Sequence, residues 1–138
     1  MADGIYDHGR ESFLKGEIAI ATDNIKVVLV HTGGGHYVVD LANDQFLSAI
    51  ASGDRIATTA NLASKTTTAG VFNAANTVFT AVAAGPAAGA IVIYDDTGTA
   101  GTSRLIAYID SYSGLPVTPN GADIDVSWAT DSNKIFKL

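Results

Sequence analysis

Two histidines, His31 and His36, bracket three consecutive glycines in the segment His31-Thr32-Gly33-Gly34-Gly35-His36. Three glycines in a row lose too much entropy to sit inside a helix or strand, so the segment is expected to be a loop. Both imidazoles could turn toward one metal ion, but a catalytic zinc ion takes three protein ligands and a structural one four. No third ligand stands nearby in the sequence. The pattern therefore favours solvated loop histidines, with no metal ion and no cofactor.

Paired carboxylates are the second group of residues that could do chemistry. Asp123 and Asp125 share one face of an expected strand, and Asp95 and Asp96 stand in an expected hairpin loop. Such pairs can hydrolyse glycosides or bind calcium. On the solvent side of an edge strand, however, carboxylates also block unwanted strand pairing. We predict no catalytic centre, and a protein that is not an enzyme.

The elements that must position these residues are strands. In Ala90–Asp110, two apolar runs flank a polar connection that contains glycine. Apolar residues occupy both faces of the second run, which predicts a β-hairpin placed centrally in a sheet. Strict alternation places Leu105 and Ala107 on one face and Ile106 on the other.

Further patterns predict the rest of the fold. Other strands are expected at Ile18–Ile20, Ile25–Val30, Ala122–Ala129 and Lys134–Leu138 and between Thr66 and Tyr94, and short helices at Asp7–Lys15 and Asn43–Ile50. Asp7 is expected to cap the first helix. Alternation within Ala122–Ala129 places Trp128 in the core. The prediction is a mainly β fold, an antiparallel β-sandwich or barrel-like domain with one or two short helices.

Composition limits the class of protein. The chain has 138 residues, 47% hydrophobic and 16% charged, with no cysteine, which predicts one β-rich domain over residues 1–138. Residues 1–17 are expected to form a short helix or a docking arm. The net charge is −6 and the basic residues are scattered, so we expect no nucleic-acid partner. The uncharged stretch Thr66–Tyr94 predicts no membrane contact, because its continuous apolar part is shorter than a membrane-spanning helix and contains Pro86.

Several stretches taken together carry a family resemblance. They are Gly4–Gly16, Asn24–Val30, Phe46–Ile50, Ala90–Tyr94, Arg104–Asp110, Gly114–Gly121 and Asn133–Leu138. They resemble a family of small proteins encoded in the structural modules of tailed bacteriophages. The resemblance implies a non-enzymatic virion protein, made in the host cytoplasm, that binds the major capsid protein as a cement or decoration protein of the head. A tail or neck component is the alternative.

Docking on a shell requires a contact surface. We expect a homo-oligomer, a dimer or a trimer, whose shell contact uses the chain termini or the uncharged central segment. The candidate contact residues are Ile5, Tyr6, Phe13, Leu14, Val71, Phe72 and Phe79. Large apolar patches are rarely left in water, and the centres of interfaces are depleted in charge. The competing explanation is that Thr66–Tyr94 fills the core of the domain itself.

Two other classes of function stay open at this point. A carbohydrate- or receptor-binding module would use Trp128, Tyr108 or Tyr112 as an exposed aromatic platform. An enzyme would need the Asp and His residues of loops 31–36, 95–102 and 123–125 to converge at one end of the fold.

Overall fold

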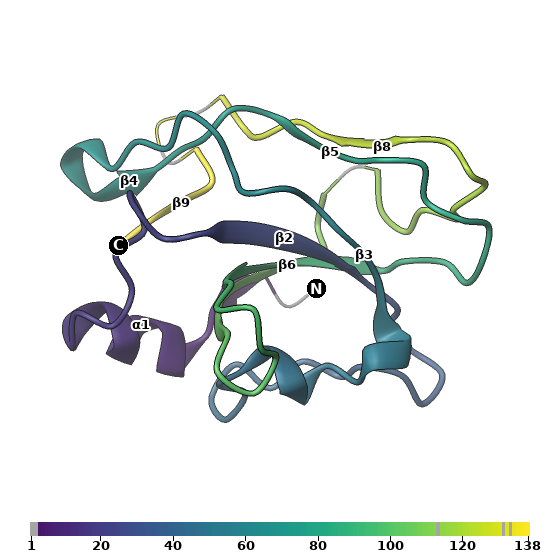
Figure 1. Ribbon diagram of the computed structural model, residues 1–138, viewed down its shortest axis with the longest axis horizontal. Helices are drawn as coiled ribbons and strands as arrows, with labels where there is room; N and C mark the ends of the chain where they lie inside the picture. Colours follow the sequence, from purple (N-terminus) through teal and green to yellow (C-terminus); the bar gives the residue numbers. More distant parts are fainter. Residues whose placement is uncertain (1–2, 113, 131, 133) are drawn as a thin grey trace.

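The computed structural model describes residues 3–112, 114–130, 132 and 134–138. Over these residues the fold is mainly antiparallel β, as the sequence predicts, and Figure 1 shows its layers. The strands are β1 (Gly4–Ile5), β2 (Ile25–Val30), β3 (Arg55–Thr58), β4 (Val71–Phe72), β5 (Thr77–Phe79), β6 (Ala90–Asp95), β7 (Arg104–Ile109), β8 (Ile124–Val126) and β9 (Phe136–Lys137). The helical elements are α1 (Asp7–Leu14) and the short 3-10 turns η1 (Leu47–Ala49), η2 (Ser52–Asp54) and η3 (Thr68–Gly70).

In the described residues, five strands form a central antiparallel sheet in the order β1-β7-β6-β2-β3. Two further pairs, β4-β9 and β5-β8, form two-stranded ribbons that cover one face of this sheet. The other face is covered by loop segments that contain η1 and η2 (Figure 1). This arrangement confirms the prediction of a β-sandwich-like domain.

The hairpin of β6 and β7 lies at the centre of the sheet. β6 pairs along its whole length with β2, from Ile25↔Asp95 to Val30↔Ala90, and on its other side with β7. Every residue of β6 is buried, because both faces of the sheet are covered. The structure therefore confirms the central hairpin and the strand at Ile25–Val30.

A β-bulge in β7 changes the predicted alternation. Ile93 pairs with Ala107 and Tyr94 pairs with Leu105, which leaves Ile106 as an extra residue between the two pairs. Ile106 and Ala107 both pack on the ribbon side of the sheet, whereas Leu105 packs on the opposite side. The prediction that Leu105 and Ala107 share a face is wrong for this reason.

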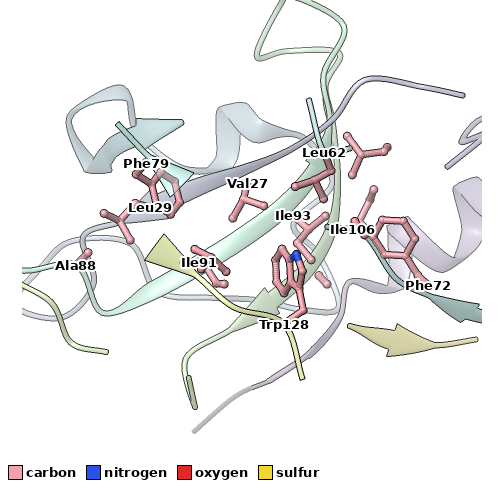
Figure 2. Packing of buried hydrophobic residues seen from close by; sticks show 14 of the residues in the cluster. Val27, Leu29, Leu62, Phe72, Phe79, Ala88, Ile91, Ile93, Ile106 and Trp128 are labelled. Carbon is pink, nitrogen blue, oxygen red and sulfur yellow. The ribbon is translucent and has the colours of Figure 1, made fainter. Parts of the chain in front are cut away.

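The layer between the sheet and the ribbons, called the ribbon face here, is built from apolar side chains of both. Its buried members include Val27, Leu29, Phe72, Phe79, Ile91, Ile93, Ile106, Val126 and Trp128. Figure 2 shows the side chains of this cluster that it labels, such as Ile93 and Trp128, converging between the sheet and the ribbons. The Trp128 ring is buried, as predicted, and its Nε1–H donates to the carbonyl oxygen of Ala75 at 3.1 Å.

The opposite face, called the tyrosine face here, mixes aliphatic and phenolic side chains. Its buried members include Tyr6, Val28, Val30, Tyr37, Leu47, Ile50, Val92, Tyr94, Leu105 and Tyr108. The hydroxyl of Tyr37 donates to Asp44 Oδ2 at 2.6 Å and lies 2.8 Å from the hydroxyl of Tyr6. Polar groups are therefore buried on this face, and hydrogen bonds satisfy them.

Helix α1 packs on the bulged strand through a glycine. A Cβ on Gly9 would lie 2.7 Å from the carbonyl oxygen of Leu105, so a larger residue would push the helix away. The helix ends near the predicted residue, with Gly16 in the left-handed region at φ 73°. It begins at Asp7, as predicted, but the predicted capping role of Asp7 is wrong, because Tyr6 occupies the N-cap position. Among the described residues, no helix is long and apolar enough to cross a membrane.

Two predicted elements do not form. Ile18–Ile20 is not a strand, since the chain turns there and the Asp23 carboxylate accepts the N–H of Ala19 at 2.8 Å. Asn43–Ile50 holds only the turn η1, not the predicted helix. Its backbone groups bond instead to strand β7 and to Ser103, the residue just before β7. The N–H of Leu105 donates to the Gln45 carbonyl at 2.9 Å, and the N–H of Leu47 donates to the Ser103 carbonyl at 2.8 Å. Pairing with the sheet has overridden the helical spacing.

The remaining strands agree in part with the sequence. Ala122–Ala129 forms only β8, but its alternation continues to the buried Trp128. Lys134–Leu138 contains β9, as predicted, and the uncharged stretch contributes β4 and β5 before β6 begins. Strand β3 was not expected from the sequence. It pairs with β2 at the edge of the sheet.

Candidate functional site

The candidate contact residues separate into a buried and an exposed group. Tyr6, Phe72 and Phe79 are buried inside the chain, with Phe72 and Phe79 on the ribbon face, so their side chains are not available on its surface. For these two phenylalanines the structure supports the competing explanation, that the uncharged segment fills the core. Val71 is partly exposed on β4.

The other three candidates, Ile5, Phe13 and Leu14, lie together in one groove. The groove has a volume of about 320 Å³ and is lined by Ile5, Arg10, Phe13, Leu14, Lys137 and Leu138. The side chain of Leu14 is 89% exposed and that of Leu138 is 58% exposed. We call this site the terminal groove. It brings α1 beside the strand β9, and Figure 1 shows the two elements on the same side of the molecule.

Aromatic rings connect the terminal groove to the core. The ring of Phe13 lies 6.5 Å from that of Phe136, and Phe136 lies 5.2 Å from the buried ring of Phe72. These tilted arrangements are favourable for aromatic pairs. They fix α1 against β9, so the exposed leucines stand on a rigid base.

Cationic side chains rim the same groove. Arg10, which lines one edge of the groove, donates to Asp7 Oδ1 at 2.8 Å. Lys137, at the other edge, is exposed. The terminal groove is therefore apolar at its centre and carries basic groups at its rim, although the chain as a whole has a net charge of −6.

The two loop histidines have a neighbour that the sequence did not reveal. One ligand atom from each of His31, His36 and Asp54 lies within 4.8 Å of the other two. The imidazole rings stack with centroids 3.6 Å apart, and His36 Nδ1 lies 2.7 Å from Asp54 Oδ1. The third group is distant in the sequence, and the pairing of β3 with β2 brings it beside the histidines.

The paired carboxylates have separate partners. Asp123 Oδ1 accepts the backbone N–H of Ala81 at 2.7 Å, which ties two loops together. Asp96 forms a salt bridge with Lys26 at 2.8 Å, and this lowers the pKa of the Asp96 carboxyl. Burial, together with the nearby charge of Asp23, raises the pKa of Asp95 to about 6. Asp123 and Asp96 thus have structural partners.

Two requirements set by the alternative functions are not met. Loops 31–36 and 95–102 lie at opposite ends of β2, about 20 Å apart for six residues of strand, so they do not converge on one site. The three aromatic residues named for the binding module line one pocket of about 480 Å³, but Trp128 and Tyr108 are buried and Tyr112 is half-buried, so they do not present the exposed aromatic platform that this alternative requires.

Comparison with known proteins adds no family to these observations: no family model matches the chain, and no curated protein matches it.

Proposed function

We propose that this chain is a non-enzymatic structural protein of a tailed-bacteriophage virion, which binds the head shell as a cement or decoration protein. The observation that carries the proposal is the terminal groove, an exposed apolar site on a rigid base. The family resemblance of the sequence supports the same role. The major capsid protein is the proposed partner.

The exposed leucines give the groove its capacity to bind. Leu14 and Leu138 are held apart from the core with most of their surface in water. Fully burying a leucine side chain against a partner contributes about 1.5–3 kcal/mol. Two leucines buried together would account for a large share of a micromolar affinity, which corresponds to about 8 kcal/mol.

The rim of the groove indicates what kind of segment it would accept. Arg10 and Lys137 flank the leucines, and charges at a rim orient a partner more than they add to its affinity. We therefore propose that the partner is an apolar segment of the capsid subunit with acidic residues at its ends. A symmetric shell presents many copies of such a segment, so a dimer or trimer of this chain would bind with avidity.

The test is a binding assay with undecorated heads of the phage that carries the gene. Leu14→Ser is expected to weaken head binding by about tenfold or more, because it removes most of the apolar surface that one leucine would bury. Val38→Ser is the matched control, since Val38 is 77% exposed but lies outside the groove. Its binding should equal that of the unchanged protein.

Three outcomes would contradict the proposal. Equal head binding by Leu14→Ser and Val38→Ser would remove the groove from the contact. Co-purification with tails and not with tailless heads would replace the head role with the tail or neck alternative. Sedimentation of both variants without heads should give the same oligomer; dissociation by Leu14→Ser alone would reassign the groove to contacts between copies of this chain.

A further inference from the structure

We propose that His31, His36 and Asp54 form a surface site for a divalent transition-metal ion of the zinc class. Two imidazole nitrogens and one carboxylate oxygen are a ligand set that suits zinc, nickel, cobalt and copper. Magnesium and calcium prefer a set built from oxygen atoms alone. This inference is independent of the terminal groove and of the proposed docking role.

The triple glycine makes the site possible. Gly33, Gly34 and Gly35 have φ values of 77°, 56° and 89°, in the region that favours glycine. Successive residues in this region turn the chain back, and the N–H of Tyr37 donates to the carbonyl of His31 at 3.3 Å. His36 is thereby placed over His31, with its ring stacked on the other at 3.6 Å.

The sheet supplies the third ligand from a distant part of the sequence. β2 and β3 are antiparallel and Val30 pairs with Arg55, so the residue after β2 meets the residue before β3. These residues are His31 and Asp54, and His31 N–H donates to the Asp54 carbonyl at 2.9 Å. Two of the ligands therefore stand on backbone that is fixed by the sheet, and only His36 stands on the loop.

The three ligand atoms stand near one another, and a bound ion would adjust their separations. A tetrahedral ion with bonds of about 2.0–2.1 Å holds its ligand atoms about 3.3–3.5 Å apart. The three ligand atoms already lie within 4.8 Å of one another. The His36 side chain is 42% exposed, and binding an ion would replace its stacking on His31 and its 2.7 Å contact with Asp54 Oδ1. Three protein ligands leave at least one coordination position open for water or for a group from another molecule.

Zinc binding tests the proposal directly. Untagged protein, treated with chelator and dialysed, is titrated with zinc chloride by calorimetry at neutral pH, and we expect one ion bound per chain. His31→Asn and His36→Asn should each weaken zinc binding by about tenfold or more, and Asp54→Asn by about tenfold. Zinc should also raise the melting temperature of the unchanged protein, because it binds only the folded site.

His8→Asn is the matched control. His8 is also an exposed histidine beside a carboxylate, with Nδ1 3.2 Å from Glu11 Oε2, but it has no second histidine near it. Zinc affinity should not change in this variant. Cobalt gives a second readout, since its visible bands in the unchanged protein should be lost in His36→Asn. Equal zinc affinity in the unchanged protein and His36→Asn would overturn the proposal, as would magnesium binding with the same affinity as zinc.

Discussion

The two faces of the central sheet are closed in different ways. The ribbon face is covered by regular strands, and its contacts are between apolar side chains. The tyrosine face is covered by the irregular segment 37–54, and phenol hydroxyls bond there to one another and to Asp44. Hydrophobic burial has no direction, whereas hydrogen bonds do. The difference teaches that loops without regular pairing can cover a sheet when buried polar groups fix their position.

The largest effect is expected on the ribbon face. Phe79→Asp should abolish folding, because an unpaired carboxylate at a position that is 1% exposed costs several kcal/mol, a large part of the stability of a small domain. Val78→Asp is the control, since the neighbouring Val78 is 36% exposed on the same strand. Circular dichroism and urea unfolding should show a folded protein for Val78→Asp alone. A folded Phe79→Asp protein would show that the ribbons can separate from the sheet.

Alkaline pH should destabilise the tyrosine face. Burial raises the pKa values of Tyr6 and Tyr37 above the ordinary range and that of Tyr108 to about 12. In an unfolded chain these hydroxyls lose their protons near pH 10. Above that pH the folded state holds protons that the unfolded state has released, so stability falls as the pH rises. We expect little change below about pH 9 and a loss of several kcal/mol by about pH 12.

The measurement is urea unfolding across that range, followed together with tyrosinate absorbance. Absorbance from the buried tyrosines should appear only as the protein unfolds. Tyrosinate that forms fully near pH 10 in a folded protein would mean that the irregular segment opens on the tyrosine face.

Removing a single hydroxyl should have a smaller effect. Tyr37→Phe keeps the ring but leaves the Tyr6 hydroxyl and the Asp44 carboxylate without their shared partner. A buried polar group without a hydrogen bond costs about 1–3 kcal/mol. Tyr94→Phe is the comparison within the same face, since that hydroxyl is not part of the Tyr6–Tyr37–Asp44 chain. Equal unfolding free energies for the two variants would show that the chain of hydroxyls does not hold the loop cover.

The ribbon face also explains which elements could be predicted from the sequence. β2 and the hairpin of β6 and β7 are apolar on both faces, a pattern that few other structures produce. Strand β3 and the segment 37–50 carry no such pattern. Their positions are set by pairing with strands that are distant in the sequence, so the local sequence does not predict them. Asn43–Ile50 has helical spacing, yet its backbone groups bond to the chain at Ser103 and Leu105.

The candidate sites follow the same rule. Ile5, Phe13 and Leu14 were named as candidate contact residues from the sequence, and the structure places all three in the terminal groove. Asp54 was missed because it is 18 residues from His36, and β3 was not recognised. Recognising β3 as the antiparallel partner of β2 would have placed Asp54 beside His31.

The smallest effect concerns the end of β6, beyond the closed faces, where two neighbouring carboxylates behave oppositely. Asp95 is 5% exposed, and its burial, together with the nearby charge of Asp23, raises its pKa to about 6. Asp96 is less buried than Asp95, and it forms a salt bridge with Lys26 at 2.8 Å. Asp95→Asn should stabilise the protein at neutral pH by about 1–2 kcal/mol.

The sign follows from the pKa of each group. Between pH 4 and about 6, folded Asp95 holds a proton that the unfolded chain has lost, so its contribution to stability decreases as the pH rises through that range. The gain from Asp95→Asn should therefore be present at about pH 7.5 and largely absent near pH 4.

For Asp96 the pKa is lowered by its bond to Lys26, so the contribution of Asp96 to stability is present at neutral pH and is lost as the pH falls through the folded pKa. Asp96→Asn should accordingly destabilise the protein at neutral pH, by up to about 1 kcal/mol for a partly exposed pair. Urea unfolding of both variants at the two pH values tests the contrast. If both substitutions change stability with the same sign at neutral pH, burial and the charge of Asp23 do not raise the pKa of Asp95. The end of the sheet would then be open to water.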